Sequence, residues 1–280
     1  MRAVRFGIAL GRMHPSMFAE AVTMADELGF ESIWFPEHLV LPVDMAGSPF
    51  AGAEHPPVPP STPVFDVFGY LSFLAGRTRQ IRLGTHVYNL GLRHPFVAAR
   101  AVQTADVVSG GRLEVGVGAG WLRSEWEAAG LDFDTRGARL DEALQVCTRL
   151  WTEDRVEHHG RFFDFGTVMF EPKPVQRPHP PVIVGGESPA ALRRAARHDG
   201  WIGLNHTPDS VRPPLETLAG LRAQAGATGR FTVTVGGSVA SDADVDAFAG
   251  AGVDRLIVSP WARTREVPEA LAAFASRYLS

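Results

Sequence analysis

The chain has 280 residues, a length that suits one large α/β domain as well as two smaller ones, and its formal net charge is −4 at pH 7. Because the charge is slightly negative and no run of basic residues occurs, nucleic acid is not an expected partner. Cys147 is the single cysteine, which excludes an internal disulfide and a cysteine-based metal cluster.

Short apolar runs alternate with helical segments along the chain. Eight runs are predicted to be strands, and they begin at Phe6, Ser32, Ile81, Leu113, Val182, Trp201, Phe231 and Arg255. Continuous runs of β-branched residues and leucine are typical of buried parallel strands. Eight strand–helix units predict a closed (β/α)8 TIM barrel over residues 1–280 as a single domain. An open doubly wound sheet is the alternative fold, but no glycine loop follows the first strand in the pattern that it requires.

Two regions depart from the alternation. The first, Leu41–Phe65, is rich in proline and glycine, and loops of this length are usually lids or disordered. The second lies between the fourth and fifth strands, from Trp121 to Pro181. It holds an amphipathic helix near Arg139–Trp151 and a hairpin-like piece, "RVEHHGRFFDFGTVMF".

Three glycines at alternate positions, Gly116, Gly118 and Gly120, end the fourth strand in "EVGVGAGWLRSEW". The dinucleotide fingerprint G-x-G-x-x-G is not met, because Gly120 follows Gly118 by two residues. Two interpretations stay open. Bare backbone lets a flat ligand lie against the main chain, or the glycines relieve crowding inside a barrel.

Polar residues at the carboxyl ends of the strands are the candidates for chemistry, because barrel active sites form there. Glu37 and His38 follow the second strand and could donate or accept a proton, although His38 could equally bind a ligand or loop without titrating. His86 and Asn89 follow the third strand and are expected to face the site or its rim. The alternative for His86 is a buried histidine with its hydrogen bonds satisfied.

The segment "VGGESPAALRR" is the clearest physical motif. Ser188 is a natural helix N-cap and Pro189 stands at the first helical position. Free N–H groups and the helix dipole favour an anion there, typically a phosphate. The alternative is an ordinary capped helix after a tight turn.

Other site classes are not expected. No histidine pair has the spacing of metal ligands, and no G-x-S-x-G occurs, so neither a metal site nor a hydrolase serine is predicted. Cys147 lies in the apolar "ALQVCTRLW" and is expected to be a buried structural thiol. No apolar stretch is long enough to span a membrane, and "MRAVRFGIAL" leads at once into a strand-like run, so a cytoplasmic protein is expected.

These segments together resemble a known family. The stretches "ADELGFESIWFPEH", "GTHVYNLGLRHP", "VGVGAGWLRSEWEAAG" and "EPKPVQRPHPPVIVGGESPAALRRAARHDGW" are similar to those of luciferase-like oxidoreductases, in particular the branch that uses the deazaflavin coenzyme F420. The resemblance covers nearly the whole chain. It implies a (β/α)8 barrel with an insertion between strands four and five.

The resemblance also assigns roles to residues. The isoalloxazine-like ring would lie over strands two to four, against a non-proline cis peptide at His86–Val87. The acidic residue and histidine after strand two, here Glu37 and His38, would stand close to the reactive ring as the catalytic pair. The residues expected to bind the cofactor are His86, Val87, Asn89, Gly118, Gly120, Gly185, Gly186 and Ser188, of which the last three would hold its phosphate.

One departure from the family concerns the substrate. F420-dependent sugar-phosphate dehydrogenases of the family carry a glutamate where this chain has Ala119, and Lys173 is the single lysine. A sugar phosphate is therefore disfavoured. The pocket under the Leu41–Phe65 loop is expected to be apolar, with Phe50, Trp121 and Trp261 as candidate walls.

The resemblance thus predicts an oxidoreductase that transfers a hydride between F420 and a small organic substrate. An FMN-dependent monooxygenase that uses reduced flavin and O2 is one alternative. A non-catalytic F420 carrier is another. Family members are often dimers through helices near strands two and three, and the apolar "FDVFGYLSFLAG" fits a homodimer.

Overall fold

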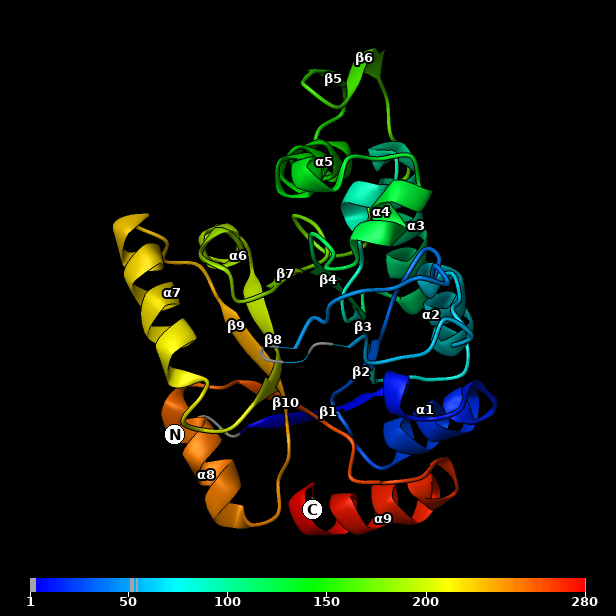
Figure 1. Ribbon diagram of the computed structural model, residues 1–280, viewed down its shortest axis with the longest axis vertical. Helices are drawn as coiled ribbons and strands as arrows, with labels where there is room; N and C mark the ends of the chain where they lie inside the picture. The colour runs from blue at the N-terminus through cyan, green and yellow to red at the C-terminus, as the bar shows by residue number, and fades with distance from the viewer. Residues whose placement is uncertain (1–3, 51–52, 54, 280) are drawn as a thin grey trace.

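The computed structural model describes residues 4–50, 53 and 55–279. Its eight parallel strands form a closed barrel in the order β1-β10-β9-β8-β7-β4-β3-β2 (Figure 1). The strands are β1 (Arg5–Ala9), β2 (Ser32–Phe35), β3 (Arg82–Thr85), β4 (Leu113–Val117), β7 (Val182–Gly185), β8 (Gly200–His206), β9 (Thr232–Gly237) and β10 (Arg255–Val258). The predicted (β/α)8 barrel is confirmed.

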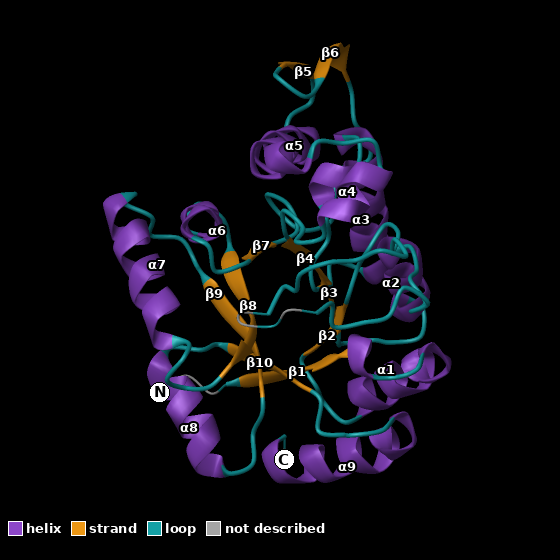
Figure 2. Cartoon of the chain, viewed as in Figure 1, coloured by secondary structure: helices purple, strands orange, loops and turns teal. Residues whose placement is uncertain are grey.

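Helices surround the barrel on its outer side (Figure 2). They are α1 (Phe18–Glu27), α2 (Val67–Ala75), α3 (Pro95–Ser109), α6 (Pro189–Ala195), α7 (Arg212–Gln224), α8 (Asp242–Ala251) and α9 (Val267–Tyr278). A helix follows each barrel strand, as the predicted strand–helix units require. The buried apolar residues of these helices pack on the strands.

Two hydrophobic clusters lie on the two sides of the strands. The larger cluster, which includes Ile33, fills the space between strands and helices. The smaller consists of Trp34, Ile183, Ile202 and Ile257. Since Ile33 and Trp34 are neighbours in β2, they point to opposite faces, and the smaller cluster therefore fills the barrel interior.

An ionic network closes the barrel at the amino ends of the strands. Arg255, 1% exposed, lies over the Trp34 ring at 5.2 Å. Its guanidinium donates two hydrogen bonds to Glu31, two to Glu114 and one to Thr234, at 2.6 to 3.1 Å. A guanidinium has five N–H donors, so all of them are used.

The predicted insertion between the fourth and fifth barrel strands is also confirmed. It holds α4 (Arg123–Ala128), α5 (Arg136–Thr152) and an antiparallel pair, β5 (Val156–His159) with β6 (Asp164–Val168). The pair projects beyond α5, away from the barrel (Figure 2).

One carboxylate ties the turn of this hairpin to α5. Glu142 accepts hydrogen bonds from the backbone N–H groups of Arg161, Phe162 and Phe163 at 2.9 to 3.1 Å. Its carboxylate also lies 3.2 Å from Nε2 of His158. Arg149 of α5 adds a hydrogen bond to the Glu157 carbonyl in β5 at 2.7 Å, so two side chains of this helix hold the hairpin.

The Leu41–Phe65 segment forms no helix or strand in its described residues, as predicted for a long loop; residues 51, 52 and 54 lie outside the described residues. In Figure 1 it runs from the end of β2 across the ring of strands before the chain reaches α2. Asp66 then caps α2 by accepting from the Gly69 N–H at 2.6 Å.

Cys147 is fully buried in α5, and burial raises the pKa of its thiol, which agrees with a structural role. Within the described ranges, no helix combines the length and apolar character needed to cross a membrane.

Candidate active site

Glu125 is the centre of a buried polar network at the carboxyl ends of β2, β3 and β4. It lies in the first turn of α4, and its side chain is fully buried. One carboxylate oxygen accepts from the backbone N–H groups of Leu39 at 2.6 Å and Val40 at 3.4 Å. The other lies 3.0 Å from Nδ1 of His38 and accepts from the Asn89 side-chain amide at 3.4 Å. These donors replace the water that a buried carboxylate loses.

His38 is held in one orientation by this network. Because an ionised carboxylate only accepts hydrogen bonds, the contact with Glu125 places a proton on Nδ1 of His38. In the neutral ring, Nε2 is then the acceptor. Trp121 contacts the ring edge-on, with 5.9 Å between centroids, and 17% of the His38 side chain stays exposed. His38 can therefore offer a defined acceptor to a ligand.

Glu37 is buried beside His38, yet both its oxygens have protein partners. One lies 2.5 Å from Nη2 of Arg93, and the other accepts from the backbone N–H of Asn89 at 2.8 Å. Burial raises the pKa of the Glu37 carboxyl, and the Arg93 guanidinium opposes that rise. The sequence suggested proton transfer for Glu37. The contacts instead give it a positioning role at the end of β3.

His86 brings an unsatisfied polar atom to the same end of the barrel. Its Nε2 is buried and has no hydrogen-bond partner among the residues that the structure describes. Burial lowers the pKa of His86 from 6.5 to about 4, so the ring is neutral at physiological pH. The cis peptide implied by the family resemblance is present at His86–Val87. The alternative of a satisfied buried histidine does not fit this atom.

Val87 explains two of the glycines. A Cβ on Gly118 would lie 2.6 Å from one methyl of Val87, and a Cβ on Gly185 would lie 3.0 Å from the other. A Cβ on Gly116 would lie 1.9 Å from the Thr85 carbonyl oxygen. Of the two interpretations left open by the sequence, relief of crowding therefore accounts for Gly116 and Gly118.

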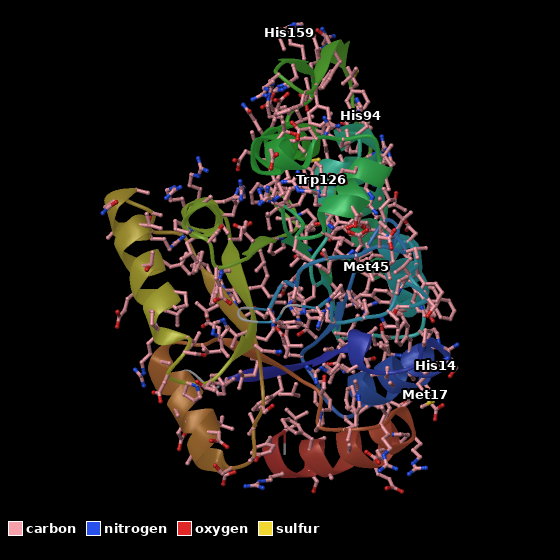
Figure 3. All side chains as sticks on the ribbon, viewed as in Figure 1. His14, Met17, Met45, His94, Trp126 and His159 are labelled. Carbon is pink, nitrogen blue, oxygen red and sulfur yellow. The ribbon has the colours of Figure 1, made fainter. Side chains whose placement is uncertain are left out.

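Gly120 has a different reason to be glycine. Its φ of +81° lies in the left-handed region, which other residues rarely adopt. A Cβ there would lie 2.8 Å from Nε1 of Trp126 and 3.0 Å from Oδ1 of Asn89. Both atoms are buried and lack a protein partner in the described structure. Trp126, on α4, is labelled in Figure 3.

The turn after β7 has the predicted cap. Ser188 accepts a hydrogen bond from the Ala191 N–H at 3.2 Å, and Pro189 opens α6. Gly186 has a φ of +103°, and its carbonyl accepts from the indole of Trp201 at 2.9 Å. Gly186 and Ser188 are exposed, so the turn is open to a ligand.

His206, at the end of β8, ties this turn to the next strand. Its Nε2 lies 3.0 Å from a carboxylate oxygen of Glu187, and its Nδ1 lies 3.2 Å from the Ser210 hydroxyl. The hydrogen bond from His206 lowers the pKa of Glu187, against the effect of burial.

The structure thus groups the predicted residues in two places. His38 and Asn89 are joined through Glu125, a residue that sequence reasoning missed, and Glu37 joins them through the backbone of Asn89. An acidic residue directly before Trp126 in "LRSEW", soon after the glycine-ended strand, was its one visible signal. Gly185, Gly186 and Ser188 form the separate turn after β7.

The three residues predicted to be pocket walls lie in different surroundings. Trp121 lies against His38, as expected for a wall. Trp261 does not: it packs in the main core and donates its indole N–H to the Arg12 carbonyl at 2.9 Å. Phe50 is half-buried in the loop. Lys173 donates hydrogen bonds to the carbonyl groups of Leu150 and Glu153 near the end of α5.

Comparison with known proteins identifies a family that agrees with the resemblance seen in the sequence. The model of the family described as luciferase-like monooxygenase matches residues 4–276. An uncharacterized protein of Mycobacterium tuberculosis is 29% identical over 254 residues, which cover 90% of this chain and 85% of that one. The FMNH(2)-dependent dimethylsulfone monooxygenase of Pseudomonas putida is 37% identical over 138 residues, 48% of this chain and 38% of that one.

A solved structure gives the same fold. The coenzyme F420-dependent tetrahydromethanopterin reductase of Methanopyrus kandleri superimposes with a TM-score of 0.78 at 18% identity, over 99% of each chain.

Proposed function

The chain belongs to the luciferase-like monooxygenase family, and from that premise we propose that it is an oxidoreductase that transfers a hydride between F420 and a small organic substrate. The observation that carries this proposal is the pair of histidines at the barrel mouth. Nε2 of His86 is buried without a partner among the described residues, and Nε2 of His38 is the acceptor nitrogen of an oriented ring. Ligand atoms would complete both.

The residues present fit a flavin-like ring with a phosphate-bearing tail. His86, Val87 and Asn89 would line the ring, and Gly118 and Gly120 would border it. The unpartnered Oδ1 of Asn89 and Nε2 of His86 are polar atoms that such a cofactor can satisfy. Of the similar proteins named above, one is described as F420-dependent and one as FMNH(2)-dependent, which supports a cofactor of this class.

The turn after β7 would hold the cofactor phosphate. Gly185, Gly186 and Ser188 are the proposed contacts, since exposed N–H groups at a helix start favour an anion. Glu187 is the carboxylate nearest to this anion site in sequence. Its side chain pairs with His206 at the end of β8.

When bound, F420 supplies a ring carbon that accepts or gives a hydride. His38 would orient the substrate or exchange a proton with it through Nε2. Glu125 would fix the tautomer of His38 through its contact with Nδ1. Glu37, through Arg93 and the Asn89 backbone, would hold the end of β3 in place.

A second candidate is an FMN-dependent monooxygenase that takes reduced flavin from a separate reductase and reacts with O2. The partial match to the Pseudomonas putida enzyme favours it. A third candidate, an F420 carrier without turnover, shares the binding residues and differs only in lacking a substrate reaction.

We also propose a homodimer through α2 and α3, the helices that follow β2 and β3. These two helices pack on each other and expose large apolar side chains, namely Phe73, Val97, Val107 and Val108. An exposed patch of this kind marks an interaction surface.

The test is a fluorescence titration of the cofactor-free protein with F420 and, separately, with FMN. Tighter binding of F420 supports the proposal, and tighter binding of FMN supports the monooxygenase. Binding of F420 without oxidation or reduction of any organic substrate would support the third candidate, the F420 carrier. Binding of neither would overturn all three.

A matched pair of variants sharpens this titration. His86→Gln should weaken cofactor binding by about tenfold, because it alters a buried polar contact. His159→Gln, on the exposed tip of the hairpin, should bind as wild type does. Equal affinities in the two variants would remove His86 from the cofactor site.

A further inference from the structure

One oxygen of the Glu125 carboxylate is shared by two side chains. Oε2 lies 3.0 Å from Nδ1 of His38 and accepts a hydrogen bond from Nδ2 of Asn89 at 3.4 Å. Glu125 and Asn89 are both buried, at 0% and 3% exposed, and a hydrogen bond to a carboxylate is stronger in such surroundings than in water. The hold of Glu125 on His38 therefore depends on where the Asn89 amide lies.

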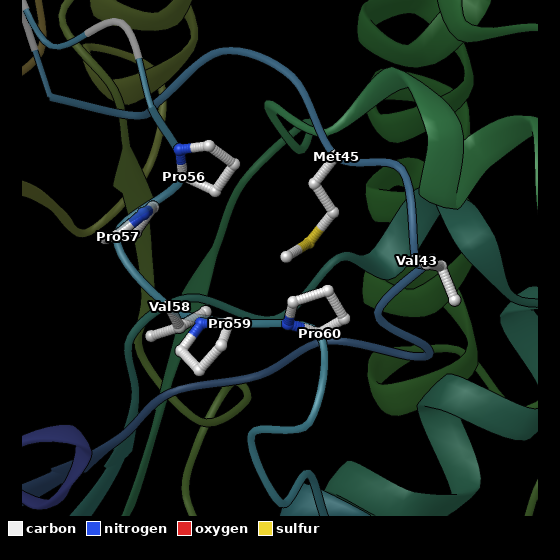
Figure 4. A pocket seen from close by; sticks show the side chains of 7 residues that line it. All are labelled: Val43, Met45, Pro56, Pro57, Val58, Pro59 and Pro60. Atoms are coloured by element: carbon white, nitrogen blue, oxygen red, sulfur yellow. The ribbon is translucent and has the colours of Figure 1, made fainter.

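The other oxygen, Oε1, is bound by the two residues that precede the Leu41–Phe65 loop. The backbone N–H groups of Leu39 and Val40 donate to it at 2.6 and 3.4 Å. Beyond them the loop runs round a hollow of about 350 Å3 that is lined by Val43, Met45, Pro56, Pro57, Val58, Pro59 and Pro60 (Figure 4). These lining side chains carry no hydrogen-bond donor, so they add no bond to Glu125.

The Asn89 side chain is held in one orientation against α4. An ionised carboxylate only accepts hydrogen bonds, so the NH2 group of the amide turns to Glu125 and Oδ1 turns away from it. A Cβ at position 120 would lie 3.0 Å from Oδ1 and 2.8 Å from Nε1 of Trp126. Because this position is glycine, the amide can lie against α4, the helix that carries both Glu125 and Trp126.

Arg93 fixes the backbone from which this amide projects. Its Nη1 donates to the Asn89 carbonyl at 3.2 Å. Its Nη2 lies 2.5 Å from Glu37, whose other oxygen accepts from the Asn89 N–H at 2.8 Å. The guanidinium also lies over the Tyr88 ring at 4.5 Å, and the Arg93 side chain is 14% exposed. The fork of one arginine and one carboxylate thus holds both backbone polar groups of Asn89.

We propose that Arg93 is a positioning residue that, through Asn89, sets how strongly Glu125 holds His38. The clamped amide occupies part of the hydrogen-bonding capacity of Oε2, and this limits how tightly the carboxylate draws the Nδ1 proton. A tighter hold on Nδ1 would make Nε2 a better proton acceptor. Arg93 therefore tunes the atom of His38 that a ligand meets. The part of that atom in turnover rests on the proposed function.

The Nδ1 proton of His38 is the probe, because its NMR resonance moves downfield as its hydrogen bond shortens. Cofactor-free protein labelled with 15N in histidine would be compared at one pH and low temperature. His38→Gln identifies the resonance by its loss. Asn89→Ala removes the amide and leaves the pair of Arg93 with Glu37 in place, so we expect a downfield shift.

Arg93→Lys tests the start of the path. The variant keeps a cation beside Glu37 but loses the fork that also reaches the Asn89 carbonyl. We expect a downfield shift that is smaller than that of Asn89→Ala. Arg100→Lys is the matched control, because Arg100 also lies over an aromatic ring, that of Phe170 at 3.9 Å, and also donates to a backbone carbonyl. Its His38 resonance should equal that of the wild type.

Two outcomes would overturn the inference. The first is an unchanged or upfield resonance in Asn89→Ala. The second is an unchanged resonance in a folded Arg93→Lys, because a loss of stability in urea without a shift means that Arg93 is structural only. If Arg93→Lys does not fold, Glu37→Gln, which removes the charge that anchors Arg93, takes its place with the same expectation.

The measurement needs no cofactor, so its outcome does not depend on the proposed function. Wild type and the variants would then be titrated with F420 and FMN. The expected downfield shifts without binding of either cofactor to the wild type would keep the role of Arg93 and overturn the proposed function. Binding of F420 to the wild type with unchanged resonances in the variants would overturn the role of Arg93 alone.

Discussion

Each end of the barrel holds a polar network. The two networks differ in whether their hydrogen-bonding atoms all have protein partners. At the amino ends of the strands, the five donors of Arg255 meet Glu31, Glu114 and Thr234. At the carboxyl ends, the network around Glu125 leaves Nε2 of His86 and Oδ1 of Asn89 without protein partners. A closed network holds the fold together, and an open one is ready for a ligand.

Charge balance differs in the same way. Burial would raise the pKa of Glu114, but Arg255 and Arg82 outweigh burial and lower it. At the other end burial prevails for Glu37, whose pKa is raised despite Arg93. The comparison teaches that the barrel interior tolerates charge where partners surround it on all sides. Variants at each end can test this difference.

The largest expected effect is at the closed end. Arg255→Met would leave the buried Glu114 and the partly buried Glu31 with fewer partners, and we expect a loss of about 3–5 kcal/mol in the free energy of unfolding. Urea unfolding would measure it. Arg277→Met is the control, because the pair of Arg277 with Asp242 is exposed and should be worth about 0–1 kcal/mol. Equal losses in the two variants would contradict the comparison.

The next effect concerns pH at the open end. The pKa of His86 is about 4 in the folded chain and near 6.5 when exposed, so below pH 6.5 the unfolded state binds the proton first. Stability from this residue is complete above pH 6.5 and falls as the pH drops toward 4, by about 3 kcal/mol in all. His86→Gln should flatten this part of the profile.

Urea unfolding at pH 7 and pH 4.5 would measure that change, with His159→Gln as the exposed control. If His86→Gln and wild type lost the same stability between these two pH values, the burial of His86 would not act as described.

A smaller effect is expected on turnover. His38→Ala should lower turnover at least tenfold while leaving the fold intact, because the side chain is partly exposed and acts on the ligand. Steady-state rates with saturating cofactor would measure it, and circular dichroism would check the fold. Wild-type turnover in this variant would remove His38 from the reaction.

The smallest effect belongs to Glu125, which acts through His38. Glu125→Gln keeps the shape but can no longer fix the ring tautomer, so we expect a loss of turnover of about threefold to fivefold. 15N NMR of the His38 ring should change from one tautomer to a mixture. Glu127→Gln, exposed on the same helix, is the control. An unchanged tautomer in Glu125→Gln would show that Glu125 does not position His38.

The parts of the molecule that sequence predicted are those with local causes. Strands appeared as continuous apolar runs, and the Ser188 cap depends on Ala191, three residues away. The β5–β6 hairpin likewise pairs residues close in sequence. Each needs only neighbours along the chain, which periodicity and capping rules describe.

The parts that sequence missed depend on distant partners. Glu125 meets His38 across 87 positions, and Glu37 meets Arg93 across 56. No local pattern reports such pairs. The meaning of Gly118 also depended on Val87, which reaches it only because β3 and β4 are neighbours in the barrel. Where a residue needs a partner from another strand, the fold had to be known first.

The attachment of the β5–β6 hairpin has a consequence for how the molecule opens. The backbone N–H groups of the hairpin turn are held by the carboxylate of Glu142, and the two strands pair only with each other. The hairpin should therefore detach as one cooperative unit, at lower cost than the barrel, when that carboxylate is protonated or removed. Amide hydrogen exchange would find it as the first segment to lose protection, and a protease would cut there while the eight barrel strands remain whole.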